Sequence, residues 1–73
     1  MEVKIGVQHA PRELVIETAD TAEDVEARLA DAVAGDALFT VTDSRGRRVL
    51  VPARSIAYIE IGGGVSGQVG FRS

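Results

Sequence analysis

Cysteine is absent from this chain of 73 residues, and histidine occurs once, at His9. Without cysteine the chain forms no disulfide and offers no thiolate to a metal or to a nucleophilic mechanism. A single histidine cannot build an imidazole-rich metal site. His9 stands beside Ala10 and Pro11 in a predicted exposed turn, with no partner for general-base catalysis next to it. We therefore expect a protein that is not an enzyme and holds no metal or other cofactor.

Long hydrophobic runs are also absent. No stretch approaches the roughly 20 apolar residues that cross a bilayer. The first residues, MEVKIGVQ, alternate in polarity and carry charges, which is not the pattern of a secretory signal. We expect a cytoplasmic protein without membrane contact, and the length allows one domain over residues 1–73.

Apolar periodicity predicts an α+β domain with the order β-β-α-β-β-β. Residues 3–7 and 12–18 alternate in polarity and predict a hairpin, with Leu14 and Ile16 on the inner face. Residues 22–33 repeat apolar side chains at helical spacing after Thr21, an expected N-cap, and Gly35 is the expected left-handed C-cap. Strands are predicted at 38–42, 47–51 and 55–61. One mostly antiparallel sheet with the helix on one face follows, and its other face must meet water or another molecule.

The last predicted strand, SIAYIEI, carries apolar residues on both faces. Simple alternation places Ile56 and Tyr58 on one face and Ile59 and Ile61 on the other. This pattern suits a central strand or one that a second subunit covers. We expect a homodimer in which these four residues contribute to self-association.

Glycines dominate the end of the chain. Gly62, Gly64 and Gly67 match the spacing G-x-G-x-x-G of dinucleotide-binding turns. That turn must open a helix, and the few residues that follow Gly67 leave no room for one. We therefore interpret residues 63–73 as a flexible tail, in which 69–71 is compatible with a short edge strand.

Positive charge is concentrated in DSRGRRVLVPAR, residues 43–54. Residues 1–36 hold nine acids and three basic residues, a net charge of −6, and residues 37–73 hold two acids and five arginines, a net charge of +3. Arginine suits phosphate and carboxylate groups alike. The candidate partner- or anion-binding residues are Arg45, Arg47, Arg48 and Arg54. Arginines that keep an exposed hairpin soluble would give the same pattern.

The chain also resembles a known family. MEVKIG at the start, PRELV at 11–15, the pattern D-x-R-G-R-R at 43–48 and IAYIEIG at 56–62 are similar to the small actinobacterial proteins classed as DUF3107, a domain of unknown function. The resemblance spans nearly the whole chain and implies a cytosolic protein of this length. It implies no catalytic residues, and although some members are labelled ATP-binding, the glycine pattern above gives that label little support.

We therefore expect a non-enzymatic interaction module that self-associates and contacts a larger protein through its arginine-rich hairpin. The alternative is a nucleotide- or nucleic-acid-binding protein that uses the same arginines. Nucleic acid is the less favoured partner, because the net charge is −3 and aromatic residues, on which bases stack, make up 4% of the chain.

Overall fold

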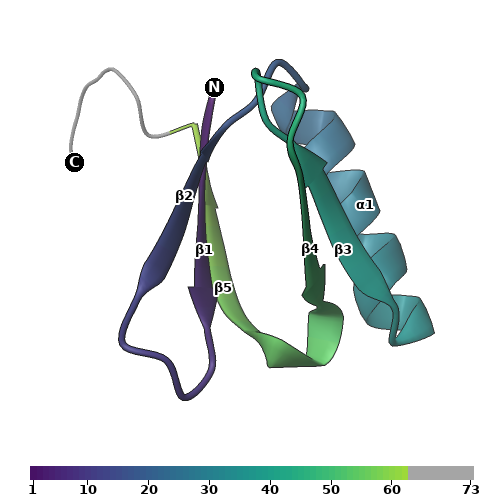
Figure 1. Ribbon diagram of the computed structural model, residues 1–73. Coiled ribbons are helices and arrows are strands. Elements are labelled where there is room, and N and C mark those ends of the chain that lie inside the picture. Colours follow the sequence, from purple (N-terminus) through teal and green to yellow (C-terminus); the bar gives the residue numbers. More distant parts are fainter. Residues whose placement is uncertain (63–73) are drawn as a thin grey trace, which may run out of the picture.

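The chain forms two small antiparallel sheets and one α-helix (Figure 1). The computed structural model describes residues 1–62. Within them, the predicted α+β class, the order β-β-α-β-β-β and the antiparallel pairing are confirmed. The expected flexible tail at 63–73 and strand at 69–71 lie outside the described residues, as do Gly64 and Gly67.

The larger sheet has the strand order β2-β1-β5. Its central strand, β1 (Glu2–Val7), pairs antiparallel with β2 (Glu13–Glu17) and with β5 (Ile56–Ile61). Alternation along β1 directs Val3 and Ile5 into the core, where both are fully buried.

The smaller sheet consists of β3 (Leu38–Thr42) and β4 (Arg48–Pro52). A turn at 43–47 joins these strands, and the single-turn 3₁₀ helix η1 (Ala53–Ser55) leads from β4 into β5. Phe39 is fully buried on β3. The strands thus divide into two sheets, a partition that strand patterns alone do not predict.

Helix α1 (Ala22–Gly35) begins at Thr21, whose hydroxyl accepts a hydrogen bond from the Asp24 N–H at 3.1 Å, as predicted. The expected cap at Gly35 is wrong. Asp36, with φ of 51°, adopts the left-handed conformation instead, which aspartate tolerates because its short side chain can hydrogen-bond locally. No helix within residues 1–62 combines the length and the apolar run that crossing a bilayer requires.

One hydrophobic core lies between the two sheets and the helix. Its buried side chains come from the larger sheet, α1, the smaller sheet and η1: Val3, Ile5, Ile16, Val25, Ala32, Phe39, Val41, Val51 and Ala53. The residues of the larger sheet that alternate with its core residues are mostly charged, and they include Glu2, Lys4 and Glu60. The smaller sheet completes the core, and the outer face of the larger sheet is mostly polar, so it is suited to contact with water.

Strand β5 contains a bulge that changes which side chains point inward. Its register with β1 shifts so that Gly6 lies opposite Tyr58, while Val7 lies opposite Ile56. Ile56 consequently packs against the core together with Ile59 and Ile61, and Tyr58 lies on the outer face over Gly6. The predicted grouping of Ile56 with Tyr58 is wrong for this reason.

Hydrogen bonds join the two sheets at one end. The Ser44 N–H donates to the Glu17 carbonyl oxygen at 2.8 Å, and the Thr18 hydroxyl donates to the Thr42 carbonyl oxygen at 2.8 Å. At the other end η1 connects β4 directly with β5 (Figure 1). The two sheets are therefore held together at both ends. Between these points the β2 edge of the larger sheet faces the β4 edge of the smaller sheet.

The contact between Gly6 and Tyr58 yields a stability prediction. A methyl group at position 6 would overlap the Tyr58 ring, so Gly6→Ala is expected to lower the unfolding free energy by about 1–3 kcal/mol, as overpacking does. Urea denaturation measures the change. Gly35→Ala is the control, because its Cβ meets open space in a helix and alanine there is expected to add about 0.5–1 kcal/mol. Equal destabilisation by the two substitutions would contradict the packing explanation.

Candidate functional site

Asp43 organises the turn that presents the arginines. Its Oδ1 accepts hydrogen bonds from the main-chain N–H groups of Arg45 at 2.9 Å and Arg47 at 2.8 Å. Its Oδ2 accepts one from Arg47 Nε at 2.7 Å. Gly46 supplies the left-handed conformation of the turn, with φ of 87°. Only 6% of the Asp43 side chain is exposed, so this buried carboxylate stabilises the turn of the hairpin.

These contacts set the protonation behaviour of Asp43. Burial acts to raise its pKa, and the hydrogen bonds from the Arg47 side chain and from the main chain of Arg47 and Arg45, with the positive charge of Arg47, act to lower it. The net effect is a pKa below the ordinary value of 3.8. The carboxylate thus stays ionised and holds the turn at neutral pH.

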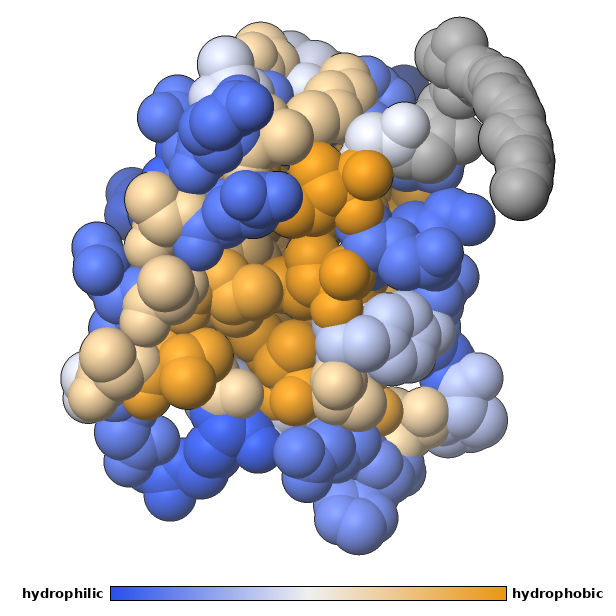
Figure 2. Space-filling view, turned by 180° about the vertical axis from the view of Figure 1, so that it is seen from behind, coloured by the Kyte–Doolittle hydropathy of each residue, from blue (hydrophilic) through white to orange (hydrophobic). Residues whose placement is uncertain are grey.

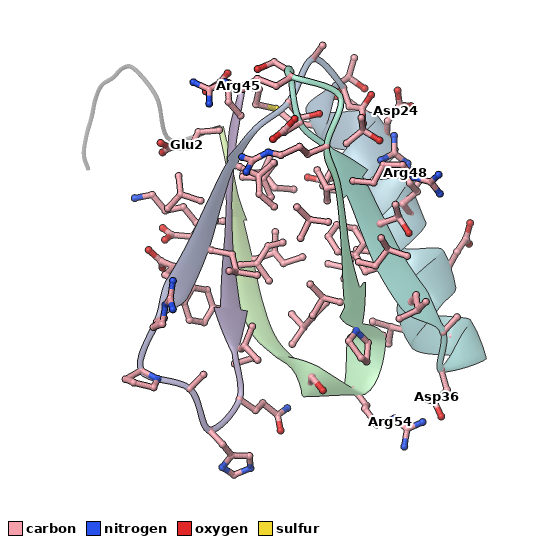
Figure 3. All side chains as sticks on the ribbon, in the orientation of Figure 1. Glu2, Asp24, Asp36, Arg45, Arg48 and Arg54 are labelled. Atoms are coloured by element: carbon pink, nitrogen blue, oxygen red, sulfur yellow. The ribbon has the colours of Figure 1, made fainter. Side chains whose placement is uncertain are left out.

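The four predicted arginines do not form one cluster. Figure 3 shows Arg45 and Arg48 directed to opposite sides of the hairpin end, Arg48 toward the side of α1. Arg54 lies beyond the other end of β4, where its Nε is 3.5 Å from Asp36 Oδ1. Within residues 1–62, neither Arg45 nor Arg48 makes an ion pair. The structure therefore brings Arg45, Arg47 and Arg48 to one hairpin, which we call the arginine hairpin, and leaves Arg54 apart.

The outer edge of β5 is the first of the open strand edges. The Gly62 N–H donates to the Glu2 carbonyl oxygen at 2.8 Å, and in an antiparallel pair only alternate residues face the partner strand. The main-chain groups of Ile59 and Ile61 therefore point away from β1. Within residues 1–62 no hydrogen bond reaches them.

Hydrophobic side chains gather beside this edge. Figure 2 shows them at the centre of the face seen from behind, between α1 and the larger sheet and within a polar rim. The adjoining elements supply half-buried isoleucines on β5 and half-buried Leu29 on α1, while Val33 is 60% exposed. An open edge next to an apolar surface is a setting for association with another strand.

The second open edge belongs to β2, which faces β4 across a groove of about 330 Å³. Three residues of β2, the last residue of the turn and the first two residues of β4 line this groove: Leu14, Val15, Ile16, Arg47, Arg48 and Val49. The Thr18 N–H donates to the Met1 carbonyl oxygen at 2.9 Å, so by the same alternation the main chain of Val15 points away from β1 and toward the groove side. Sequence reasoning missed this groove, because it depends on the division into two sheets.

The outer edge of β3, in contrast, is occupied from within the chain. Arg28 Nη1 donates to the Thr40 carbonyl oxygen at 3.3 Å, and Arg28 Nη2 lies 2.8 Å from Asp20 Oδ2. The Thr18 hydroxyl donates a hydrogen bond to the Thr42 carbonyl oxygen. This edge offers a partner no free acceptor at these positions.

Tyr58 belongs to the outer face of the larger sheet. Its hydroxyl donates a hydrogen bond to the Glu13 carboxylate, which pins the ring over Gly6. This hydrogen bond, followed by partial burial and the negative charges of Glu13 and Glu60, raises the pKa of the phenol above 10.0. Tyr58 therefore has a structural contact, although 48% of it is exposed.

The remaining sequence candidates do not join a site. His9 is exposed in the β1–β2 turn with φ of 63°. Among residues 1–62 no group of three or more His, Asp or Glu side chains could hold a metal ion. Gly62 ends β5 with φ of 82°, and the other glycines of its motif lie outside the described residues.

Comparison with known proteins gives one result on family membership. A family model described as "Protein of unknown function (DUF3107)" matches residues 1–72. A search among curated proteins finds no match.

The hydrogen bonds to Asp43 predict a pH dependence of stability. Because the folded-state pKa is lower than the unfolded one of about 3.9, the stabilisation is fully present above that pH and is lost as pH falls through the folded pKa. Asp43→Asn removes this titration, so the variant should be less stable at neutral pH and should lose less further stability than the parent between about pH 5 and pH 2. Thermal unfolding across this range measures both curves, and parallel curves would contradict the assignment.

The tyrosine titration tests the outer-face contact. The chain has one tyrosine and no tryptophan, so phenolate absorbance reports Tyr58 alone. Its midpoint is expected above 10.0 in the parent protein, and Glu13→Gln should lower it by removing both the charged acceptor and its negative field. An unchanged midpoint in Glu13→Gln would show that Glu13 does not hold the ring.

Proposed function

The chain belongs to this family of proteins of unknown function, and we propose that it is a non-enzymatic, cytoplasmic interaction module that forms a homodimer through β5 and contacts a partner through the arginine hairpin. The observation that carries the dimer is the open edge of β5. Its main-chain groups at Ile59 and Ile61, which accept or donate no hydrogen bond within residues 1–62, adjoin an apolar surface. Pairing with another strand would give these main-chain groups hydrogen-bond partners and would cover the apolar surface.

The β5 edge of a second copy fits this edge better than the β4 edge or the β2 edge of that copy. The edge of β4 ends at Pro52, which offers no N–H donor, and β2 carries Glu13 and Glu17, which would repel their counterparts in another copy. β5 has neither proline nor lysine, and its one acid is Glu60. Two copies of β5 can pair antiparallel about a two-fold axis, the commonest symmetry of homo-oligomers.

Charge selects the register of this pairing. Only residues whose main chain points outward can form the hydrogen-bonded pairs, and an axis through Ile61, the last residue of β5, would leave Ile59 without a partner in the second β5. The axis therefore passes either through Ile59 or through Glu60. An axis at Glu60 places two carboxylates directly opposite each other, which is unfavourable. An axis at Ile59 places Glu60 opposite Tyr58 of the second copy. We therefore propose the register centred on Ile59.

The arginine hairpin supports a separate contact with an anionic partner. Residues 43–48 hold three arginines and one aspartate, a net charge of +2, in a chain whose net charge is −3. Because Asp43 accepts the hydrogen bonds of the turn, the guanidinium groups of Arg45 and Arg48 remain available. An acidic protein surface is the proposed partner. The same two free guanidinium groups keep a nucleotide or nucleic acid as the second candidate.

Single cysteines test the dimer and its register, since the parent chain has none. Hydrogen-bonded antiparallel neighbours lie about 5.5 Å apart between Cα atoms, within the range that a disulfide spans. Ile59→Cys should therefore form a covalent dimer under mild oxidation. Glu60→Cys should not, because in this register the two positions 60 are diagonal neighbours about 7–8 Å apart.

Val15→Cys is the matched control for non-specific oxidation, since it lies on the opposite edge of the same sheet and is exposed. Cross-linking at Glu60 in place of Ile59 would refute the register. Equal cross-linking of all three variants, or sedimentation of the parent as a monomer at high micromolar concentration, would refute the dimer.

A further inference from the structure

We propose that the groove between β2 and β4 binds an extended segment of a partner protein, with an acidic residue at the segment's N-terminal end. The inference builds on the proposed role of the arginine hairpin and gives that role a site and a ligand class. It is independent of dimerisation, because β2 and β5 are opposite edges of the larger sheet.

Main-chain pairing is the first reason for an extended ligand. Val15 presents its N–H and carbonyl groups away from β1, and within residues 1–62 no hydrogen bond reaches them. The Val15 side chain is 58% exposed, so this edge is accessible. A peptide that adds a strand to an open sheet edge gains affinity from such main-chain groups.

The shape and lining of the groove set the ligand's length and pattern. β2 meets the hairpin turn where Ser44 donates to Glu17, which closes the groove at that end. From Glu13 to Ile16, short of this closed end, the edge spans three residue steps, about 10 Å at about 3.3 Å per step, so about four extended residues of a ligand lie along it. Leu14 and Val49 line the groove, so alternate side chains of the ligand that point inward are apolar.

The direction of the segment follows the antiparallel pairing of the rest of the sheet, and charge then sets the position of the acid. β2 runs toward the arginine hairpin, so a segment antiparallel to β2 has its N-terminal end beside Arg47, which lines the groove, and near the turn that carries Arg45. Its C-terminal end lies beside the exposed Glu13. Glu17 also lies at the N-terminal end of the segment, but its carboxylate is paired with the N-terminal amine of Met1 at 2.6 Å. An acidic residue is thus favoured at the first position and disfavoured at the last. Figure 3 shows the Arg48 side chain directed to the other side, so Arg48 contributes its main chain to this edge.

Pools of blocked pentapeptides are suitable probes. The first pool has Asp at position one, a mixture of Val, Ile, Leu and Phe at positions two and four, and Thr elsewhere. Matched pools place Lys or Ser first, or Asp last, and a short single-stranded RNA represents the nucleic-acid alternative. Titration into isotopically labelled protein, followed by NMR, reports both affinity and location.

The Asp-first pool is expected to bind several-fold more tightly than the other pools, to shift the Val15 amide resonance and to slow its hydrogen exchange. Ile16 is the internal control, because its main chain faces β1 and should be protected already. No shift at Val15 with any pool at millimolar concentration, slow exchange of Val15 in the free protein, or a preference for Lys-first or Asp-last peptides would overturn the proposal.

Two pairs of variants locate the effect. Val15→Pro removes the outward N–H without breaking the pairing with β1 and should abolish peptide binding, as edge strands tolerate proline there. Arg45→Glu should weaken binding of the Asp-first pool several-fold, and Arg54→Glu, with the same change in charge at the far end of β4, should leave it unchanged.

The outcomes separate this inference from the proposed function. If Arg45→Glu weakens binding but Val15→Pro does not, the arginine hairpin binds anions and the groove is not the site. If the RNA binds and shifts hairpin resonances but not that of Val15, the peptide is the wrong ligand class. Equal effects of Arg45→Glu and Arg54→Glu refute both the groove and the hairpin, and sedimentation of the same variants reports on β5 separately.

Discussion

Unpaired strand edges are the constraint on which the rest of this structure depends. Two sheets of three and two strands have four outer edges, and each edge carries main-chain donors and acceptors that need partners. The chain satisfies part of this need itself. Arg28 and Thr18 reach the carbonyl groups of β3, and Ser44 reaches the end of β2. The edges that residues 1–62 leave open are those of β5, the middle of β2 and β4, and the last two face each other across the groove. These are the places where other molecules can add strands.

The arginine hairpin shows how one buried carboxylate separates structure from recognition. Asp43 takes three hydrogen bonds from the turn and from Arg47, so the conformation of the turn does not depend on the side chains of Arg45 or Arg48. Those two guanidinium groups can exchange water for a partner's carboxylate without disturbing the turn. A surface arginine that also held the turn would have to give up its contact with the turn in order to bind a partner's carboxylate.

Local patterns in the sequence predicted the local structure well, and long-range geometry set the rest. Thr21 caps the helix, and Leu14 and Ile16 face the core as expected, because capping and strand alternation act over a few residues. The division into two sheets was not predictable in this way, since it depends on which distant strands pair. The bulge opposite Gly6 likewise reversed the facing of Ile56, although the Gly6 that admits the Tyr58 ring was a signal that sequence reasoning overlooked.

The candidate site was predictable only in part for the same reason. The charge count drew attention to the hairpin at residues 43–48, but four arginines close in sequence proved to lie at both ends and on both sides of β4. Strand length explains this: five residues of β4 at about 3.3 Å each carry Arg54 more than about 13 Å from the turn. Proximity in sequence along an extended strand is therefore weak support for a shared binding patch.

The two proposed contacts use opposite edges of one sheet, and this arrangement has a geometric consequence. Pairing of β5 with β5 of a second copy joins two three-stranded sheets in the order β2-β1-β5-β5-β1-β2. The two β2 edges then form the ends of the joined sheet, separated by five strand spacings, or about 24 Å at about 4.8 Å each. The two grooves are related by the two-fold axis, so the segments bound in them run in opposite directions. A partner with two acidic segments and a linker that spans this distance would bind both grooves at once, and the second contact would benefit from a high effective concentration. Because each groove contacts only a few residues of a ligand, dimerisation through β5 would make such a module selective for partners that present paired segments.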